Sequence, residues 1–269
     1  SPPDSAYGRP EDLKRLVDAL HARGLMAFMD VVYNYFGPEG NFLNAYAPDF
    51  FDPSIETPWG AAIDFSRPQV RRFFVENALY WLDEFRFDGL RFDAVHAIRD
   101  DSEPHILTEI VGLVRAELGS DRHVHLVLEN DANEAHRLRR SAAGSAVRYD
   151  AQWNDDFHHA AHHVATGETD GYYADFTEDA VYKLGRALCE GFIYQGDPSP
   201  NHDGQEQRVQ STPGVEPLPI DSKLMLRFPQ REAAVAHDGS AVIAGQPWSL
   251  RQEFLGPVCG EPSRCSDSI

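Results

Sequence analysis

The sequence predicts an α/β fold built on a parallel β-sheet. Over residues 1–196, short apolar segments alternate with amphipathic helical segments, which is typical of repeated helix–strand units. Four of the apolar segments also end in polar residues. In parallel α/β proteins the carboxyl ends of the strands form the edge where ligands bind, so the same pattern predicts where a functional site lies.

The first helix–strand pair lies within residues 10–33. Pro10 suits the first turn of a helix, and Gly24 suits its end. The segment 25–33 is short and mostly apolar, as expected for a strand buried on both faces. The apolar face of the helix consists of Leu13, Leu16, Val17 and Leu20.

Three further strands follow, each after a helix. Ser66 is expected to cap a helix that leads to the strand 89–95. The helix 104–118 leads to the strand 124–129, and a shorter helix over 134–140 leads to the strand 147–153. The apolar face of the first of these helices consists of Val70, Phe74, Ala78, Trp81 and Phe85. The polar residues at the four strand ends are Asp30, Asn34, Asp93, His96, Glu129, Asn130, Gln152 and Asn154.

From residue 197 onward the composition changes. The last 73 residues hold nine of the 18 prolines and two of the three cysteines, and their helical and strand periodicity is weak. We therefore expect two parts, a structured α/β domain over residues 1–196 and an irregular, Pro-rich tail over residues 197–269. A disordered segment and a shifted reading frame are both compatible with this tail.

Composition limits the partners and the location. The chain has 24 Lys and Arg against 43 Asp and Glu, a net charge of −19. Such a surface repels phosphate backbones and anionic lipids, so we expect neither nucleic acid nor a membrane as partner. Three scattered cysteines do not form a disulfide framework, and residues 1–4 do not resemble a signal peptide. These features predict a cytoplasmic protein.

Two carboxylates are candidates for catalysis. Asp93 and Glu129 end consecutive predicted strands, so their side chains are expected to meet at one edge of the sheet. Arg91 lies two residues before Asp93 and points to the same side of the strand, where it would keep that carboxylate ionised. A pair of carboxylic groups is what glycoside hydrolysis usually requires. The spacing is equally compatible with a structural Arg–Asp ion pair.

The motifs around these residues resemble the signatures of the α-amylase family of glycoside hydrolases. Residues 30–34 (DVVYN) resemble the first signature, residues 89–96 (GLRFDAVH) the second, and Glu129 stands where the third carries its acid/base. The resemblance covers about residues 1–200 and implies a (β/α)8 TIM barrel. The barrel would be incomplete, because the first two strands and the last ones have no counterpart here.

The resemblance also implies the roles of the central residues. Asp93 would be the nucleophile of a retaining reaction, and Glu129 would donate and then accept the proton. Arg91 would position Asp93, and no metal or organic cofactor would be needed.

Several motifs are similar to the trehalose-releasing members of the family. They lie at residues 34–41, 96–98, 129–133, 151–159 and 171–175. The implied substrate is malto-oligosyltrehalose or a related α-glucan, cleaved at the α-1,4 linkage next to the terminal trehalose unit. A glucan-branching enzyme and an inactive fragment that binds glucan weakly are the alternatives. The implied substrate-binding residues are Asp30, Asn34, Tyr35, His96, Asn130, Asp131, Trp153, Asp155, Asp156, His158 and His159.

The chain departs from the family pattern in three ways. Tyr35 replaces the His that normally follows the Asn of the first signature. The third family carboxylate would be Asp203, in Asn-His-Asp, but no apolar strand precedes it and we interpret the match as coincidence. Missing barrel strands would leave open sheet edges, so we expect the isolated chain to be poorly stable and weakly active or inactive.

Simpler structural interpretations exist for two of these features, and a metal site is an alternative for the histidines near them. Asp155 and Asp156 are compatible with a helix cap, and Trp153 is compatible with a core position. The histidines at 158, 159, 162 and 163 have the i, i+4 spacing of a zinc site, but they lack a Glu or Cys that would complete a known motif. We therefore predict no metal in the site.

Overall fold

The computed structural model places an open, parallel sheet at the centre of the protein. β1 (Phe28–Val32), β4 (Gly89–Asp93), β5 (His125–Glu129) and β6 (Ala151–Trp153) pair in that order, all in parallel. The backbone of β9 (Leu224–Met225) pairs in parallel with β6. The predicted α/β class and parallel sheet are confirmed. The structure describes residues 5–37, 41–57, 60–119, 121–141, 146–195 and 197–199, and five short strands between residues 205 and 248.

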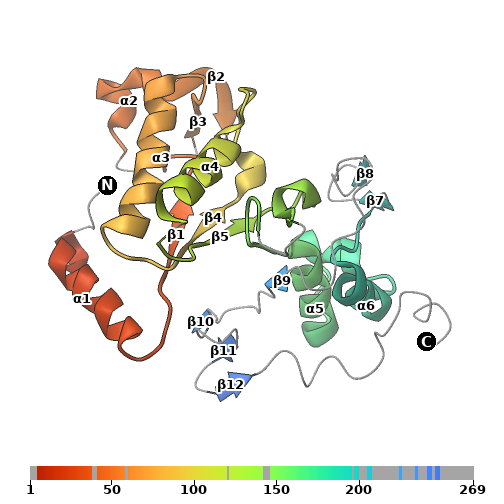
Figure 1. Cartoon of the computed structure of the whole chain (residues 1–269). Helices are drawn as coiled ribbons and strands as arrows, with labels where there is room; N and C mark the ends of the chain where they lie inside the picture. The colour runs from red at the N-terminus through yellow and green to blue at the C-terminus, as the bar shows by residue number, and fades with distance from the viewer. Residues whose placement is uncertain are drawn as a thin grey trace.

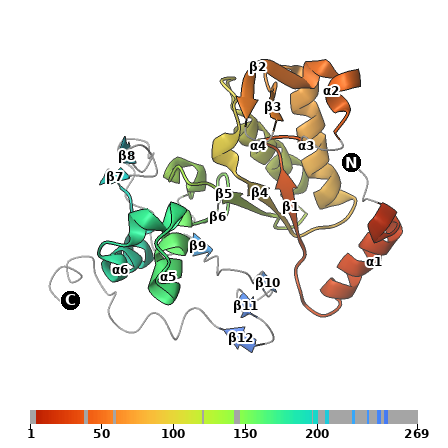
Figure 2. The ribbon, with the colours of Figure 1, turned by 180° about the vertical axis from the view of Figure 1, so that it is seen from behind.

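Two long helices cover one face of this sheet. α3 (Pro68–Asp83) and α4 (Ile106–Leu118) lie side by side over β4 and β5, whereas α1 (Pro10–His21) lies to one side (Figures 1 and 2). Within the described residues, none of the helices combines the length and the apolarity that crossing a membrane requires. The predicted apolar face of α3 is buried at Val70, Phe74, Ala78 and Trp81. Phe85, the fifth predicted residue, is also buried but lies two residues beyond the end of the helix.

A hairpin that the sequence did not reveal follows β1. α2 (Leu43–Tyr46) and η2 (Pro48–Phe50) lead into the antiparallel pair β2 (Phe51–Thr57) and β3 (Gly60–Ile63). Phenylalanine rings hold this insertion against α3, since Phe50 packs edge-on against Phe73 with ring centroids 5.3 Å apart. Insertions at this end of the strands border the edge where a site was predicted.

A second, smaller apolar cluster lies beyond β6. α5 (Asp155–Thr166) packs against α6 (Ala180–Glu190) (Figure 1). The segment that connects them along the chain contains η5 (Gly171–Phe176), which packs against α5. The cluster consists of Phe157, Ala160, Phe176, Ala187, Ile193 and Tyr194. The remaining elements are η1 (Ser5–Tyr7), η3 (Val95–Ala97), η4 (Ala135–Leu138), β7 (Asp197–Ser199), β8 (Gln205–Gln207), β10 (Ala234–Val235), β11 (Ala241–Ile243) and β12 (Gln246–Trp248).

Several local predictions were wrong. Ser66 does not cap α3, because its hydroxyl donates to Asp64 and the N-cap position falls on Arg67. The predicted helix over 134–140 is the 3-10 turn η4, and the predicted strand over 147–153 shortens to the three residues of β6. Leu16 is 55% exposed, whereas the other residues of its predicted stripe contribute to the core.

The strand register arranges one face of the sheet in layers. Phe28, Gly89 and His125 are level with one another at the amino ends of β1, β4 and β5. Asp30 and Arg91 lie one layer further along, and Asp93 one layer beyond that. Because side chains alternate along a strand, residues two apart share this face. The register therefore brings the predicted catalytic residues together at the carboxyl ends of the strands.

Candidate active site

A single guanidinium connects three carboxylates. Nη1 of Arg91 donates to both oxygens of Asp30, at 2.8 and 3.0 Å, and to Asp93 Oδ1 at 2.6 Å. Nη2 lies 2.7 Å from Glu129 Oε2. Each carboxylate comes from a different strand, so the cluster exists only when β1, β4 and β5 are paired in this register. The expected meeting of Arg91, Asp93 and Glu129 is present.

The environment of Arg91 keeps it charged. Burial lowers its pKa, but the hydrogen bond to Asp30 and the charges of Glu129 and Asp30 outweigh burial, and the pKa is raised above its usual value. The guanidinium also lies over the ring of Trp153, 4.3 Å from the ring centroid. Trp153 thus covers the ion cluster, a position intermediate between the predicted sugar platform and a core residue.

The two candidate catalytic carboxylates stay accessible at the sheet edge. The side chain of Asp93 is 26% exposed and that of Glu129 is 14% exposed. Both contact nitrogens of the same planar group, so both can face one small reacting centre. Two carboxyl groups in this relation can act as nucleophile and proton donor in glycoside hydrolysis.

The turn after Asp93 ties this strand to its neighbours. Ala94 has left-handed backbone angles, φ 40° and ψ 53°, which are uncommon for a residue with a side chain. In this conformation its N–H donates to Glu129 Oε2 at 3.0 Å, and its carbonyl accepts from Asn34 Nδ2 at 3.3 Å. Asn34 is buried and braces this turn. No pattern in the sequence indicates the role of Ala94.

The loop after β5 is held mainly by contacts within the protein. Asn130 is fully buried, donates to Glu134 at 2.8 Å and accepts from the backbone of Ala132. This geometry favours a structural role for Asn130 over the predicted sugar contact. Asp131 pairs with the exposed His96, whose Nδ1 lies 3.2 Å from Asp131 Oδ1, so these two side chains form one polar group beside the site.

The two predicted aspartates at the start of α5, Asp155 and Asp156, have different surroundings. Asn154 is the N-cap, because its side chain accepts from the backbone of Phe157 at 3.0 Å. Asp156 is buried, and its Oδ2 accepts from the backbone of Ile193 at 2.9 Å and of Tyr194 at 3.1 Å. This geometry favours an anchoring role for Asp156. Asp155 is partly buried in the same first turn.

The histidines of α5 make aromatic contacts. His159 stacks on Tyr172 with ring centroids 5.7 Å apart and planes 7° apart, and His158 lies 5.2 Å from His159. His162 stacks on Tyr173 at 4.1 Å and pairs with Glu168. Their contribution to substrate binding stays a prediction, as does that of the half-buried Tyr35. Asp203 lies outside the described residues.

The chain is similar to a set of curated enzymes. It is 44% identical over 194 residues to the malto-oligosyltrehalose trehalohydrolase of Deinococcus radiodurans, a match to 72% of this chain and 31% of that protein. It is 47% identical over 196 residues to the enzyme of the same name from Arthrobacter ramosus, covering 71% of this chain and 33% of the relative. The chain therefore spans about a third of the length of these relatives. No protein-family model matches it.

The comparison with solved structures also points to glycoside hydrolases of this kind. A Salmonella typhimurium protein, provisionally described as an alpha amylase, superposes with a TM-score of 0.75 and 47% sequence identity. The match covers 78% of this chain and 36% of that one.

Fold and sequence together define a class. Over about 72% of its length the chain is similar to glycoside hydrolases of the α-amylase family, and its sheet corresponds to part of their TIM-barrel fold. Within that family, the curated relatives it resembles at 37–47% identity over about 72% of its length are malto-oligosyltrehalose trehalohydrolases.

Proposed function

We propose that this chain carries the catalytic pair of a retaining glycoside hydrolase that releases trehalose from malto-oligosyltrehalose. The observation that carries the proposal is the contact of one guanidinium with both Asp93 and Glu129 at the ends of adjacent strands. The names of the relatives support the substrate, which is malto-oligosyltrehalose or a related α-glucan.

In the proposed reaction Asp93 attacks the anomeric carbon of the α-1,4 linkage. Glu129 donates its proton to the leaving oxygen, and a glycosyl ester forms on Asp93. Glu129 then removes a proton from water, which attacks the same carbon and releases the sugar with its original configuration. Arg91 holds Asp93 ionised and in position, since an adjacent positive charge favours the carboxylate form.

The sugar-binding roles of the other residues form the second part of the proposal. Trp153 lies over Arg91 of the ion cluster, and His96 follows Asp93 by three residues and pairs with Asp131. The half-buried Tyr35 directly follows Asn34, which braces the turn after Asp93. Asp30, Asn34, Asn130 and Asp156 support the site through bonds to other protein groups. The last four residues would thus affect substrate affinity indirectly.

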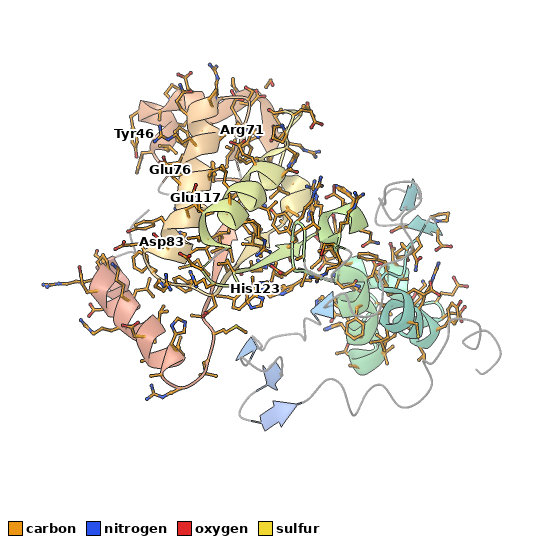
Figure 3. The ribbon with its side chains drawn as sticks, viewed as in Figure 1. Tyr46, Arg71, Glu76, Asp83, Glu117 and His123 are labelled. Carbon is orange, nitrogen blue, oxygen red and sulfur yellow. The ribbon has the colours of Figure 1, made fainter. Side chains whose placement is uncertain are left out.

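Site variants with a matched control test the proposed chemistry. Asp93→Asn and Glu129→Gln should each lower turnover of malto-oligosyltrehalose by about 10⁴-fold, because each removes a group that bonds to or protonates the reacting atoms. Glu117→Gln, an exposed change on α4, should leave turnover unchanged (Figure 3). Free trehalose is measured by chromatography, and the configuration of the new reducing end by proton NMR within the first minutes.

A branching enzyme is a second candidate. The chain is 44% identical over 100 residues, 35% of its length, to the 1,4-alpha-glucan branching enzyme GlgB of Mycobacterium bovis. New α-1,6 branches in an amylose substrate, without free trehalose, would favour this candidate. If purified chain produced neither product but bound glucan, catalysis by this chain would be contradicted and the non-catalytic alternative supported. A cytoplasmic location stays a prediction from composition.

A further inference from the structure

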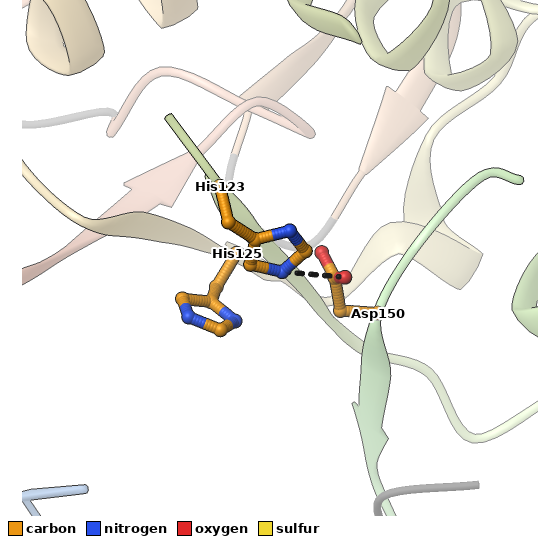
Figure 4. Close-up of side chains that lie close together, drawn as sticks. All are labelled: His123, His125 and Asp150. Atoms are coloured by element: carbon orange, nitrogen blue, oxygen red, sulfur yellow. Dashed lines mark ion pairs between the residues drawn. The ribbon is translucent and has the colours of Figure 1, made fainter. Parts of the chain in front are cut away.

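Three potential metal ligands converge at the opposite end of the strands. His123 precedes β5, His125 begins it, and Asp150 directly precedes β6. One donor atom from each lies within 4.8 Å of the other two, and Figure 4 shows the three side chains close together, with His123 facing Asp150. Since a strand rises by ~3.3 Å per residue, His125 and Glu129 are separated by about 13 Å along β5. This cluster is therefore distinct from the candidate catalytic site.

One pair of these donors already has the spacing of zinc ligands. His123 Nε2 and Asp150 Oδ1 are 3.3 Å apart (Figure 4). Two ligands that bind zinc at about 2.0–2.1 Å in a tetrahedron stand ~3.4 Å from each other. The side chain of His123 is 59% exposed, so its ring can adjust and a metal can reach it from solvent.

His125 is held in place by its surroundings. Its ring stacks on Phe28 at a centroid distance of 5.8 Å, across Gly89 of the strand between them. A Cβ at position 89 would lie 2.5 Å from Phe28 Cε1, so only glycine leaves room for this arrangement. His123 and His125 are two residues apart, and their rings meet edge to face at 4.4 Å.

Asp150 is oriented by bonds that leave its other oxygen directed at His123. Its Oδ2 accepts from Arg115 at 2.6 Å and from the backbone of Leu126 at 2.7 Å, and the residue is 5% exposed. Such outer contacts fix a ligating carboxylate and are typical of metal centres. The positive charge of Arg115 is also close, and it weakens binding of any cation here.

We propose that His123, His125 and Asp150 form a binding site for a divalent transition metal of the zinc class. Two imidazoles and one carboxylate are a common donor set for zinc, with water as the fourth ligand. The ion would join the amino ends of β5 and β6. Because β6 is the shortest of the strands β1, β4, β5 and β6, this link would stabilise the sheet where it has the fewest paired residues. The proposal does not depend on the proposed hydrolase function.

The α5 histidines are the competing site. Their spacing suggested zinc, but His162 pairs with Glu168 and stacks on Tyr173, and His159 stacks on Tyr172. Within the described residues, the three-donor grouping found is the one at His123. His162→Gln is therefore a matched control for loss of a histidine.

Zinc titration of the full chain tests the proposal. Calorimetry at neutral pH should show one equivalent of bound Zn²⁺, and zinc should raise the Tm. His123→Gln should weaken binding by at least about 10-fold and abolish the rise in Tm, because one of three protein ligands is lost. Its Tm without metal should match that of the unmodified chain, since His123 is exposed. Bound Co²⁺ should give the visible absorption of a tetrahedral site in the unmodified chain but not in His123→Gln.

The opposite results would overturn the site. Absence of stoichiometric zinc binding, or unchanged affinity in both His123→Gln and His125→Gln, would contradict it. Loss of zinc binding in His162→Gln, with binding retained in His123→Gln, would show that the metal binds at α5. That result would also contradict the proposed site. The result for His125→Gln is interpreted only together with that for His123→Gln, because the His125 substitution also removes the ring stack on Phe28.

Discussion

Arg91 Nη2 lies 2.7 Å from Glu129 Oε2, so the cation that positions the proposed nucleophile also contacts the proposed acid/base. The planar fork of arginine has two terminal nitrogens that can each serve a different carboxylate. A lysine ammonium is a single point charge and cannot reproduce both contacts with fixed geometry. The arrangement of Asp93 and Glu129 therefore depends on the shape of this side chain as well as its charge.

Arg91→Lys should lower kcat by at least about 100-fold, because misplacement of a catalytic group by about 1 Å costs that much. The side chain of Arg91 is largely buried, so the change should also lower the Tm. The control is Arg72→Lys, which alters an exposed ion pair with Glu76 on α3 and should change neither quantity. Equal kcat values for Arg91→Lys and the unmodified chain would contradict the positioning role.

Trp153→Leu should weaken glucan binding by roughly 10-fold, since an aromatic face contributes about 0.5–1.5 kcal/mol beyond its buried area. Isothermal titration with a malto-oligosaccharide measures the effect. Trp81→Leu, in the core face of α3, should lower the Tm and leave glucan affinity unchanged. An unaltered affinity in Trp153→Leu would assign the ring to packing over Arg91 alone.

Asp156→Ala and Asp155→Ala should behave differently although the residues are adjacent. Asp156 accepts from Asn133 at 3.1 Å and from two backbone N–H groups, and its loss should destabilise the fold by about 2–4 kcal/mol. Asp155→Ala should cost less than about 1 kcal/mol. Urea unfolding compares the two variants. A glucan-binding defect in Asp156→Ala without any loss of stability would show direct substrate contact instead.

Asp100 should make the fold sensitive to acid. Burial raises the pKa of Asp100, but hydrogen bonds from Ser102, the backbone of Ile106 and Arg71 outweigh it and lower the pKa below its usual value. A lowered folded-state pKa stabilises the protein above the unfolded-state pKa of about 3.9, and this stabilisation is lost as the pH falls through the folded-state value.

Asp100→Asn should therefore destabilise the chain by about 2–4 kcal/mol at pH 7, because it leaves Arg71 without one of its buried partners. The difference from the unmodified chain should shrink steadily below about pH 4. Asp101→Asn, at the exposed neighbouring position, is the control and should have little effect at either pH. A stability difference that is independent of pH would show that the charge of Asp100 is unimportant.

Gly89→Ala should destabilise the sheet by about 1–3 kcal/mol, because the added methyl group meets the backbone carbonyl oxygen of His125 on β5 and the ring of Phe28 on β1. Gly112→Ala on α4 is the control, since nothing lies within 4 Å of its added Cβ and alanine favours helix. Thermal unfolding of both variants decides the prediction. Equal stability at position 89 would mean that both the ring of Phe28 and the backbone of β5 at His125 can shift without cost.

The regular helix–strand units could be predicted because periodicity is a local property. The apolar stripe of α3 and the polar end of β4 are visible in the sequence and are confirmed by burial and pairing. The hairpin β2–β3 could not be predicted in this way. Its register shifts between Asp52 and Glu56, and it depends on rings from α3, so its own pattern carries little signal.

The candidate site could likewise be predicted only in part. The motifs that contain Asp93 and Glu129 identify the residues, but the contact of both with Arg91 needs the register of three strands. The left-handed turn at Ala94 and the bonds of Asp156 to residues 193 and 194 involve backbone groups that carry no sequence signature. The convergence of His123 with Asp150 was missed for a similar reason, since 27 positions of chain separate them.

The cluster around Arg91 also has a consequence for the charge of any ligand. One guanidinium stands against three carboxylates, on a chain whose net charge is −19. A phosphorylated or uronic sugar that approached this edge would meet a potential of its own sign, whereas an uncharged glucose polymer would meet none. The same ionic arrangement that orients the carboxylates thus discriminates against acidic sugars before any hydroxyl group is recognised.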